Sequence, residues 1–330
     1  MNPLFARFLA TVVIVLWGTT SLFAQQITEQ KKTVAFAFGT VHLPKGDGTL
    51  VTTKMPLGTV FFVYYPDSRL GTDRGFGYVV TAKHVLKDGD GRYLKEISIR
   101  VNLKNSQEQD GVTNIDGIPV SDERGDLIWF HDAKDEAIDV AAFPLLPNEN
   151  KVDFKTIPVS MFAEEPILRE FKVSEGDAVY FIGLMAQYYG QHRNFPVVRR
   201  GALALMTDEK IQTATGVQKA YIAELVTWPG NSGSPVFLNL AGMRDGSLSL
   251  GSNFRFLGLL CGGFLDRRPG TVLDASQVVL GSGANIGVSY IVPADSLKAI
   301  LESAPAREHR DLMVKQFLDA TGSIPENSRN

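Results

Sequence analysis

The chain has 330 residues, which is enough to bury one large core or to form two domains. Its hydrophobic content of 44% and charged content of 21% are those of an ordinary globular protein and argue against a disordered chain. The formal net charge is −3, or −4 without Arg7 (32 basic against 36 acidic residues), and no Lys/Arg stripe is visible. We therefore expect no nucleic-acid partner.

The first 24 residues are typical of an export signal. Arg7 precedes an apolar run at residues 8–17, and small residues lead to Ala24, after which the chain becomes polar. Cleavage after Ala24 predicts an exported protein, either periplasmic or secreted. The alternative is an uncleaved anchor, which would bring the protein to a membrane, but the run is short for a span.

Cys261 is the single cysteine, so no intramolecular disulfide is possible. It lies at the end of the apolar run of residues 256–261. This setting favours a buried small hydrophobic residue over a nucleophile.

From about Glu29 the sequence is a succession of short β-type runs separated by turn residues, with no βαβ alternation and no internal repeat. The first series comprises residues 34–38, 58–65, 76–81, 97–101, 127–130 and 140–143. The second comprises residues 178–183, 197–204, 220–224, 236–238, 256–261 and 287–292. A linker rich in Pro and Asn separates the two series at residues 144–150. The pattern predicts an all-β sandwich or barrel arrangement.

The C-terminal part is predicted to be helical. Asp295 is expected to be the N-cap of one helix, Pro305 to interrupt it, and residues 307–320 to form a second helical stretch. That second stretch either docks a partner or packs on the last barrel, and we expect the packing role.

One loop carries a candidate nucleophile, in the sequence Gly230-Asn231-Ser232-Gly233-Ser234-Pro235. A serine between glycines, on irregular backbone between apolar segments, presents its hydroxyl to a substrate carbonyl. The main-chain N–H groups of Gly230 and Ser232 are then free to face the oxyanion that forms. Taken alone, the motif is also compatible with an ordinary turn.

An activated serine needs a base and a group that orients the base. His84 follows the apolar run of residues 76–81 among small residues, and Asp139 is a single acid at the start of an apolar run. Burying that carboxylate unpaired would cost several kcal/mol, so it needs a partner, which the imidazole supplies. The remaining candidates have surface or structural settings: His42, His131, His192, His309, Asp126, Asp132 and Asp135.

The three motifs, in the order His84, Asp139, Ser232, resemble those of the trypsin/chymotrypsin-like serine peptidases, most closely the compact bacterial branch. The resemblance covers roughly residues 33–303. It implies two packed six-stranded antiparallel β-barrels with a C-terminal helix. Residues 25–150 would form the barrel carrying His and Asp, residues 151–305 the barrel carrying Ser, and residues 306–330 a helical tail.

The resemblance also implies where substrate binds. By count, Val226 stands at the floor of the specificity pocket, where a buried valine favours an uncharged residue before the scissile bond. Gly262 and Gly263 lie in the strand that pairs with the substrate backbone. Cys261 takes the place of a serine that bonds the catalytic Asp in many relatives, which puts that contact in doubt. Five further residues either line the cleft or have packing and surface roles: Tyr188, Tyr189, Arg199, Arg200 and Trp228.

Asn231 stands where the zymogen-activated branch has an aspartate that pairs with a freed N-terminal ammonium. A neutral Asn cannot make that ion pair, so the sequence predicts no such activation switch.

Two other enzyme classes do not fit. An α/β-hydrolase needs Gly at Ser234, strand–helix alternation and a histidine after the serine. A zinc enzyme needs a His/Cys cluster that is missing. The sequence therefore predicts an exported, monomeric serine endopeptidase that acts on protein or peptide substrates without cofactor or metal. The remaining alternatives are a catalytically silent binding module, or a peptidase whose loops a partner must order.

Overall fold

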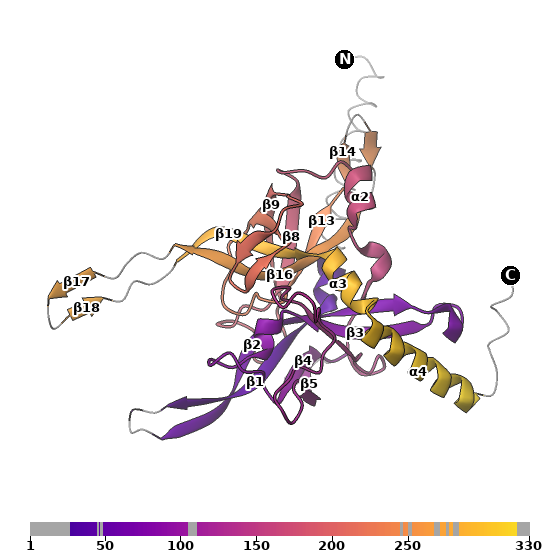
Figure 1. The fold of residues 1–330 in the computed structure, drawn as a ribbon, viewed down its shortest axis with the longest axis horizontal. Coiled ribbons are helices and arrows are strands. Elements are labelled where there is room, and N and C mark those ends of the chain that lie inside the picture. The colour runs from indigo at the N-terminus through magenta and orange to yellow at the C-terminus, as the bar shows by residue number, and fades with distance from the viewer. Residues whose placement is uncertain are drawn as a thin grey trace, which may run out of the picture.

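The computed structural model describes residues 27–44, 46, 49–104, 111–244, 247–249, 253–266, 271–274, 277–279 and 284–321. The predicted signal segment, residues 1–24, lies outside them. Two β structures lie next to each other, and a pair of helices follows the second one in the chain (Figure 1). No helix in the described part of the chain is long and apolar enough to cross a membrane.

The first sheet has the strand order β5-β4-β1-β2-β3-β6, with a short strand β7 pairing in parallel with β2. Its strands are β1 (Val34–Pro44), β2 (Leu50–Pro66), β3 (Gly75–Thr81), β4 (Glu96–Asn102), β5 (Val112–Pro119), β6 (Ala141–Pro144) and β7 (Ile157–Pro158). Aromatic and β-branched residues such as Phe61, Val79 and Ile99 are fully buried in its core, and the central strand β2 is buried at consecutive positions from Val60 to Val63.

The predicted all-β arrangement of two barrel-like structures with C-terminal helices is confirmed, and in the described residues this first sheet curls like a half-barrel without closing. Between β5 and β6 the chain makes only isolated bridges, Ser121 to Leu127 and Phe130 to Ala142. The physical reason is a turn in which the Asp122 carboxylate accepts the N–H of Asp126 at 2.9 Å. The regular strand predicted at residues 127–130 is therefore absent.

The second structure is a closed six-stranded barrel, as predicted, with the order β12-β19-β16-β13-β8-β9. Its strands are β8 (Ala178–Gly183), β9 (Val197–Leu205), β12 (Tyr221–Glu224), β13 (Pro235–Asn239), β16 (Phe254–Asp266) and β19 (Ala284–Pro293). Three hairpins that the sequence did not predict are β10 (Ile211–Thr213) with β11 (Gly216–Gln218), β14 (Gly242–Arg244) with β15 (Ser247–Ser249), and β17 (Thr271–Asp274) with β18 (Gln277–Val279). Inward-facing side chains such as Phe181, Val236 and Leu260 fill the barrel.

Short helices connect the strands, and two longer ones end the described chain. The short ones are η1 (Lys31–Thr33), η2 (Ser68–Leu70), η3 (Lys83–Leu86), η4 (Val159–Met161) and α2 (Glu165–Glu170), and the longer ones are α3 (Ala294–Leu301) and α4 (Ala304–Thr321). Asp295 is not the N-cap of α3, because Pro293 occupies that position and Asp295 falls in the first turn. Pro305 does separate the two helices, at the start of α4, where its missing N–H is not needed.

Helix α4 packs on the first sheet and not, as predicted, on the last barrel. Arg310 is buried, donates to Tyr78 Oη at 3.1 Å and to Leu301 O at 2.6 Å, and lies over the Tyr65 ring. His309 lies against the ring of Phe130. A buried guanidinium needs such acceptors, and β2 and β3 bring the two tyrosines to this face.

Candidate functional site

His84 and Asp139 are joined directly by hydrogen bonds. His84 lies in η3, one turn after β3 ends, and Asp139 lies just before β6, which pairs with β3. The Asp139 carboxylate is 1% exposed and accepts from His84 N–H at 3.0 Å and contacts His84 Nδ1 at 2.5 Å. Both of its oxygens are thus used on one residue, which fixes the orientation of the ring.

The pKa of His84 is raised above its ordinary value of 6.5. Burial opposes the imidazolium, and so does the charge of Lys87. The negative charge of Asp139 and its hydrogen bond to the ring outweigh both effects. The ring is therefore a stronger base than an isolated histidine.

Ser232 lies in the loop between β12 and β13 (residues 225–234, the serine loop), and this loop is fastened to both β structures. Thr59 N–H on β2 donates to Ser232 O at 2.9 Å, and Gly233 N–H donates to Leu260 O at 2.8 Å. Gly233 has φ +86°, and a Cβ there would lie 2.1 Å from Thr59 O, so only glycine fits.

Ser232 and His84 come to the same junction from different β structures. An ideal Cβ on Gly58 would lie 2.9 Å from Ser232 O and 2.8 Å from Cγ2 of Val85, the neighbour of His84. In the part of the chain that the structure describes, no hydrogen bond joins Ser232 Oγ to the imidazole. Such bonds are often long without substrate and tighten in the Michaelis complex.

The N–H groups of Gly230 and Ser232 have no hydrogen-bond acceptor among the described residues. The preceding carbonyls are held: Pro229 O accepts from Ala186 N–H at 3.0 Å, and Asn231 O accepts from Ser234 N–H at 3.1 Å. Because a peptide unit is planar and trans, a carbonyl held on one side directs the N–H to the other side. Two main-chain donors are thus available to an anion.

Asn231 is buried and satisfied inside the loop. Its Oδ1 accepts from Trp228 N–H at 2.7 Å, and its Nδ2 donates to Leu184 O at 2.5 Å. The side chain therefore links the serine loop to the end of β8 through neutral groups.

Thr59 is a residue of this site that sequence reasoning missed. Its Oγ1 donates to Gly230 O at 2.9 Å and accepts from Leu184 N–H at 2.8 Å. A threonine inside an apolar strand is common, and its partners are main-chain groups far away in the chain, so no sequence signal marks it.

Cys261 is buried, as predicted, and burial together with the charge of Asp139 raises the pKa of its thiol. Its Sγ donates to the main-chain oxygen of Asp139 at 3.3 Å, and a hydrogen bond with the Asp139 carboxyl group also raises the pKa of the thiol. The raised pKa keeps the thiol protonated, so Cys261 is not a nucleophile at neutral pH.

The expected substrate strand has one open edge. Along β16, pairing with β13 ends at Leu259, whereas Gly262 and Gly263 pair with Tyr290 and Ser289 of β19. The other edge of residues 261–264 has no strand partner among the described residues.

Val226 is 47% exposed, so it is not the buried valine that was expected, and its place in a specificity pocket stays a prediction. An ideal Cβ built on Gly287 would lie 3.7 Å from Cγ2 of Val226. Because glycine has no side chain, Gly287 does not cover Val226. Trp228 is also exposed and lies under the Arg199 guanidinium.

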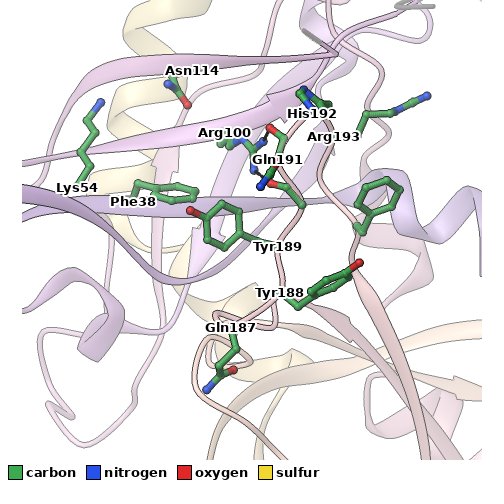
Figure 2. Close-up of a pocket in the computed structure, with 12 residues that line it drawn as sticks. Phe38, Lys54, Arg100, Asn114, Gln187, Tyr188, Tyr189, Gln191, His192 and Arg193 are labelled. Atoms are coloured by element: carbon green, nitrogen blue, oxygen red, sulfur yellow. Dashed lines mark hydrogen bonds between the residues drawn. The ribbon is translucent and has the colours of Figure 1, made fainter. Parts of the chain in front are cut away.

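A separate pocket of about 1090 Å³ lies between the first sheet and the β8–β9 loop (residues 184–196) (Figure 2). Tyr189 lines it and packs against Phe38 at 5.4 Å, while Tyr188 is 72% exposed. Arg200 does not line this pocket, and its guanidinium lies over the ring of Tyr180. His84, Asp139 and Ser232 do not line this pocket. No group of three or more His, Cys, Asp or Glu in the described ranges is placed to hold a metal ion.

No protein-family model matches the sequence. No curated protein matches it either. Two similar solved structures are the MamO protease domain from Magnetospirillum magneticum, in its apo form, and AL20, a thermostable serine protease from an extremophilic microorganism. Each is 13% identical, with 82% of this chain and 96% of that chain covered and a TM-score of 0.41. The strand order, with His84 and Asp139 on one β structure and Ser232 on the other, is that of a chymotrypsin-like fold.

Proposed function

We propose that this protein is a serine endopeptidase with Ser232 as nucleophile, His84 as general base and Asp139 as the group that orients the base. The observation that carries the proposal is the fully engaged His84–Asp139 pair beside a serine loop with two unused N–H groups. A structural ion pair alone would not require those N–H groups to be free.

The chemistry follows from this arrangement. Ser232 Oγ attacks the scissile carbonyl while His84 Nε2 accepts its proton, and the developing oxyanion receives hydrogen bonds from Gly230 and Ser232 N–H. The imidazolium then protonates the leaving amine. Water hydrolyses the acyl-enzyme by the same route in reverse order. No cofactor or metal is needed for these steps.

The substrate is proposed to be an extended peptide. The open edge of residues 261–264 supplies main-chain partners to an added strand. Val226 and the neighbouring Trp228 offer apolar surface, which favours an uncharged side chain before the scissile bond. Export through residues 1–24 and action as a monomer belong to the same proposal.

The first test is labelling of protein lacking residues 1–24 with a fluorophosphonate probe, which reacts only with an activated serine. We expect the parent protein to be labelled, and Ser232→Ala and His84→Ala each to lose labelling, because either change removes the attacking pair. Ser174→Ala is the matched control, since Ser174 is an exposed serine outside the serine loop.

Labelling that persists in Ser232→Ala would place the reactive group elsewhere. An unlabelled parent protein with an intact fold by circular dichroism would contradict the self-sufficient peptidase. It would favour the silent binding module, unless an added partner restored labelling.

The labelling rate is expected to rise with pH and to level off above an apparent pKa higher than 6.5, because only neutral His84 accepts the serine proton. Lys87 lowers the pKa of His84, so Lys87→Gln should move the inflection to higher pH, whereas Lys315→Gln on α4 should not. The contribution of His84 to the stability of the fold depends on pH in the opposite direction from the labelling rate. The raised pKa stabilises the fold below about pH 6.5, and this contribution is lost as pH rises through the folded pKa. A rate profile with its inflection below 6.5 would contradict the assignment.

A further inference from the structure

Arg100 on β4 is a buried cation that has no acidic partner in the part of the chain that the structure describes. It is 8% exposed, and no ion pair joins it to a carboxylate in the described ranges. Its guanidinium donates to Gly190 O at 2.8 Å and to Gln191 O at 2.5 Å, and lies 5.3 Å from the centre of the Tyr189 ring (Figure 2). Burying a guanidinium in this way is costly compared with an apolar side chain of similar volume. The planar guanidinium, unlike an apolar side chain, holds the carbonyl groups of two consecutive residues, Gly190 and Gln191, in fixed positions.

The same strand holds the later part of the β8–β9 loop. Asn194 N–H donates to Asn102 Oδ1 at 2.8 Å, and Asn194 Nδ2 donates to Arg100 O at 2.7 Å. Asn102 Nδ2 returns a bond to Asn194 O at 3.3 Å. Residues 190–194, which belong to the chain of the second barrel, are therefore fastened to the first sheet.

The first part of the loop touches the serine loop. Ala186 N–H holds Pro229 O, and Leu184 O accepts from Asn231 Nδ2. An ideal Cβ on Gly230 would lie 3.0 Å from Ala186 N, so the two loops are in close contact. If Ala186 moved away, the peptide between Pro229 and Gly230 would be free to turn, and its N–H would no longer face an oxyanion.

We infer that Arg100 is a positioning residue for the oxyanion-binding N–H groups. It fastens Gly190 and Gln191 to β4, and so keeps Ala186 and Leu184 where they fix the serine loop. Where an aspartate stands at the position of Asn231, a freed N-terminal ammonium pairs with it. In this chain the buried Arg100, on the first sheet, would take over the function of that ammonium. The inference rests on the proposed function for its catalytic meaning, but its structural part is testable without activity.

The test compares Arg100→Met with Arg310→Met. Both replace a buried arginine that binds a carbonyl and lies over a tyrosine, but Arg310 holds α4 and has no described contact with the β8–β9 loop. Amide hydrogen exchange should rise in residues 184–196 and 228–234 of Arg100→Met, and in α4 of Arg310→Met. The fluorophosphonate labelling rate, measured well below each melting temperature, should fall roughly 10- to 100-fold in Arg100→Met and stay within about twofold in Arg310→Met.

Chemical rescue separates positioning from a general loss of stability. Free guanidinium at millimolar concentration should restore labelling of Arg100→Ala several-fold, and it should not change the rate of Arg310→Ala.

Each outcome decides the inference. Exchange that rises only in residues 189–194, or labelling of Arg100→Met at the parental rate, overturns it while the peptidase proposal stands. An unlabelled parent overturns the peptidase proposal, and exchange in residues 228–234 then still decides whether Arg100 fixes the serine loop.

Discussion

Asp139→Asn is expected to lower the rate of serine labelling and of peptide hydrolysis by about 10⁴-fold with the fold retained. The wild-type carboxylate accepts two N–H groups of His84, one from the main chain and one from the ring. An amide has one acceptor and one donor group, so one of these contacts must face NH₂. With the amide oxygen on the main-chain N–H, the ring nitrogen becomes an acceptor and the proton moves to Nε2, which can no longer take the serine proton.

The measurement is the labelling rate of Asp139→Asn beside Asp132→Asn, which changes a carboxylate that accepts only main-chain N–H groups of its own turn. Melting temperatures of both variants show whether the buried site tolerates the amide. A loss smaller than about tenfold in Asp139→Asn would mean that this carboxylate does not orient the base.

Asn231→Asp is expected to destabilise the protein at neutral pH by about 2–4 kcal/mol and to reduce labelling by roughly 100-fold. Asn231 is 1% exposed, and its Nδ2 donates to Leu184 O. An aspartate keeps the bond from Trp228 N–H, but its second oxygen faces the Leu184 carbonyl without a proton between them. The variant therefore buries an unpaired charge and loses the link between β8 and the serine loop.

The pH dependence gives this prediction a second readout. Burial beside a carbonyl raises the folded pKa of the new Asp above its unfolded value of about 3.9. The penalty is therefore absent below that value, where the protonated acid can donate to Leu184 O, and is complete above the folded pKa. Unfolding by urea at several pH values measures it, with Asn150→Asp in an exposed turn as the control. Equal stability of variant and parent at pH 7 would refute the account.

Much of the candidate site was visible in the sequence because its chemistry is local. A lone acid at the start of an apolar strand needs a buried partner, and Asp139 has one in His84. Gly230 and Gly233 flank the segment that carries Ser232, and they indicate backbone conformations that residues with a Cβ rarely adopt. Gly233 indeed has a positive φ and lies in close contact with Thr59. Burial of Cys261 followed from its apolar run.

Other features depend on contacts that no local pattern encodes. The polar segment of β5 became a strand only because β4 supplies its partner, and the run at residues 127–130 lost its strand to the turn held by Asp122. Helix α4 lies on the first sheet, where Tyr78 accepts a hydrogen bond from buried Arg310 and the Tyr65 ring lies under its guanidinium. Val226 lies exposed beside a glycine, which counting residues along the chain does not reveal.

The sequence by itself thus predicted which side chains form the candidate site and which β structure each belongs to, since residue type and hydrophobic periodicity act over a few neighbours. The tertiary structure alone decided how the N–H groups of Gly230 and Ser232 are held. Leu184 and Ala186 act through main-chain N–H and C=O groups, and the side chains of Thr59 and Arg100 bind main-chain groups of residues far away in the chain. Such groups leave no mark in the sequence, and only the packing of the second barrel on the first sheet brings them together.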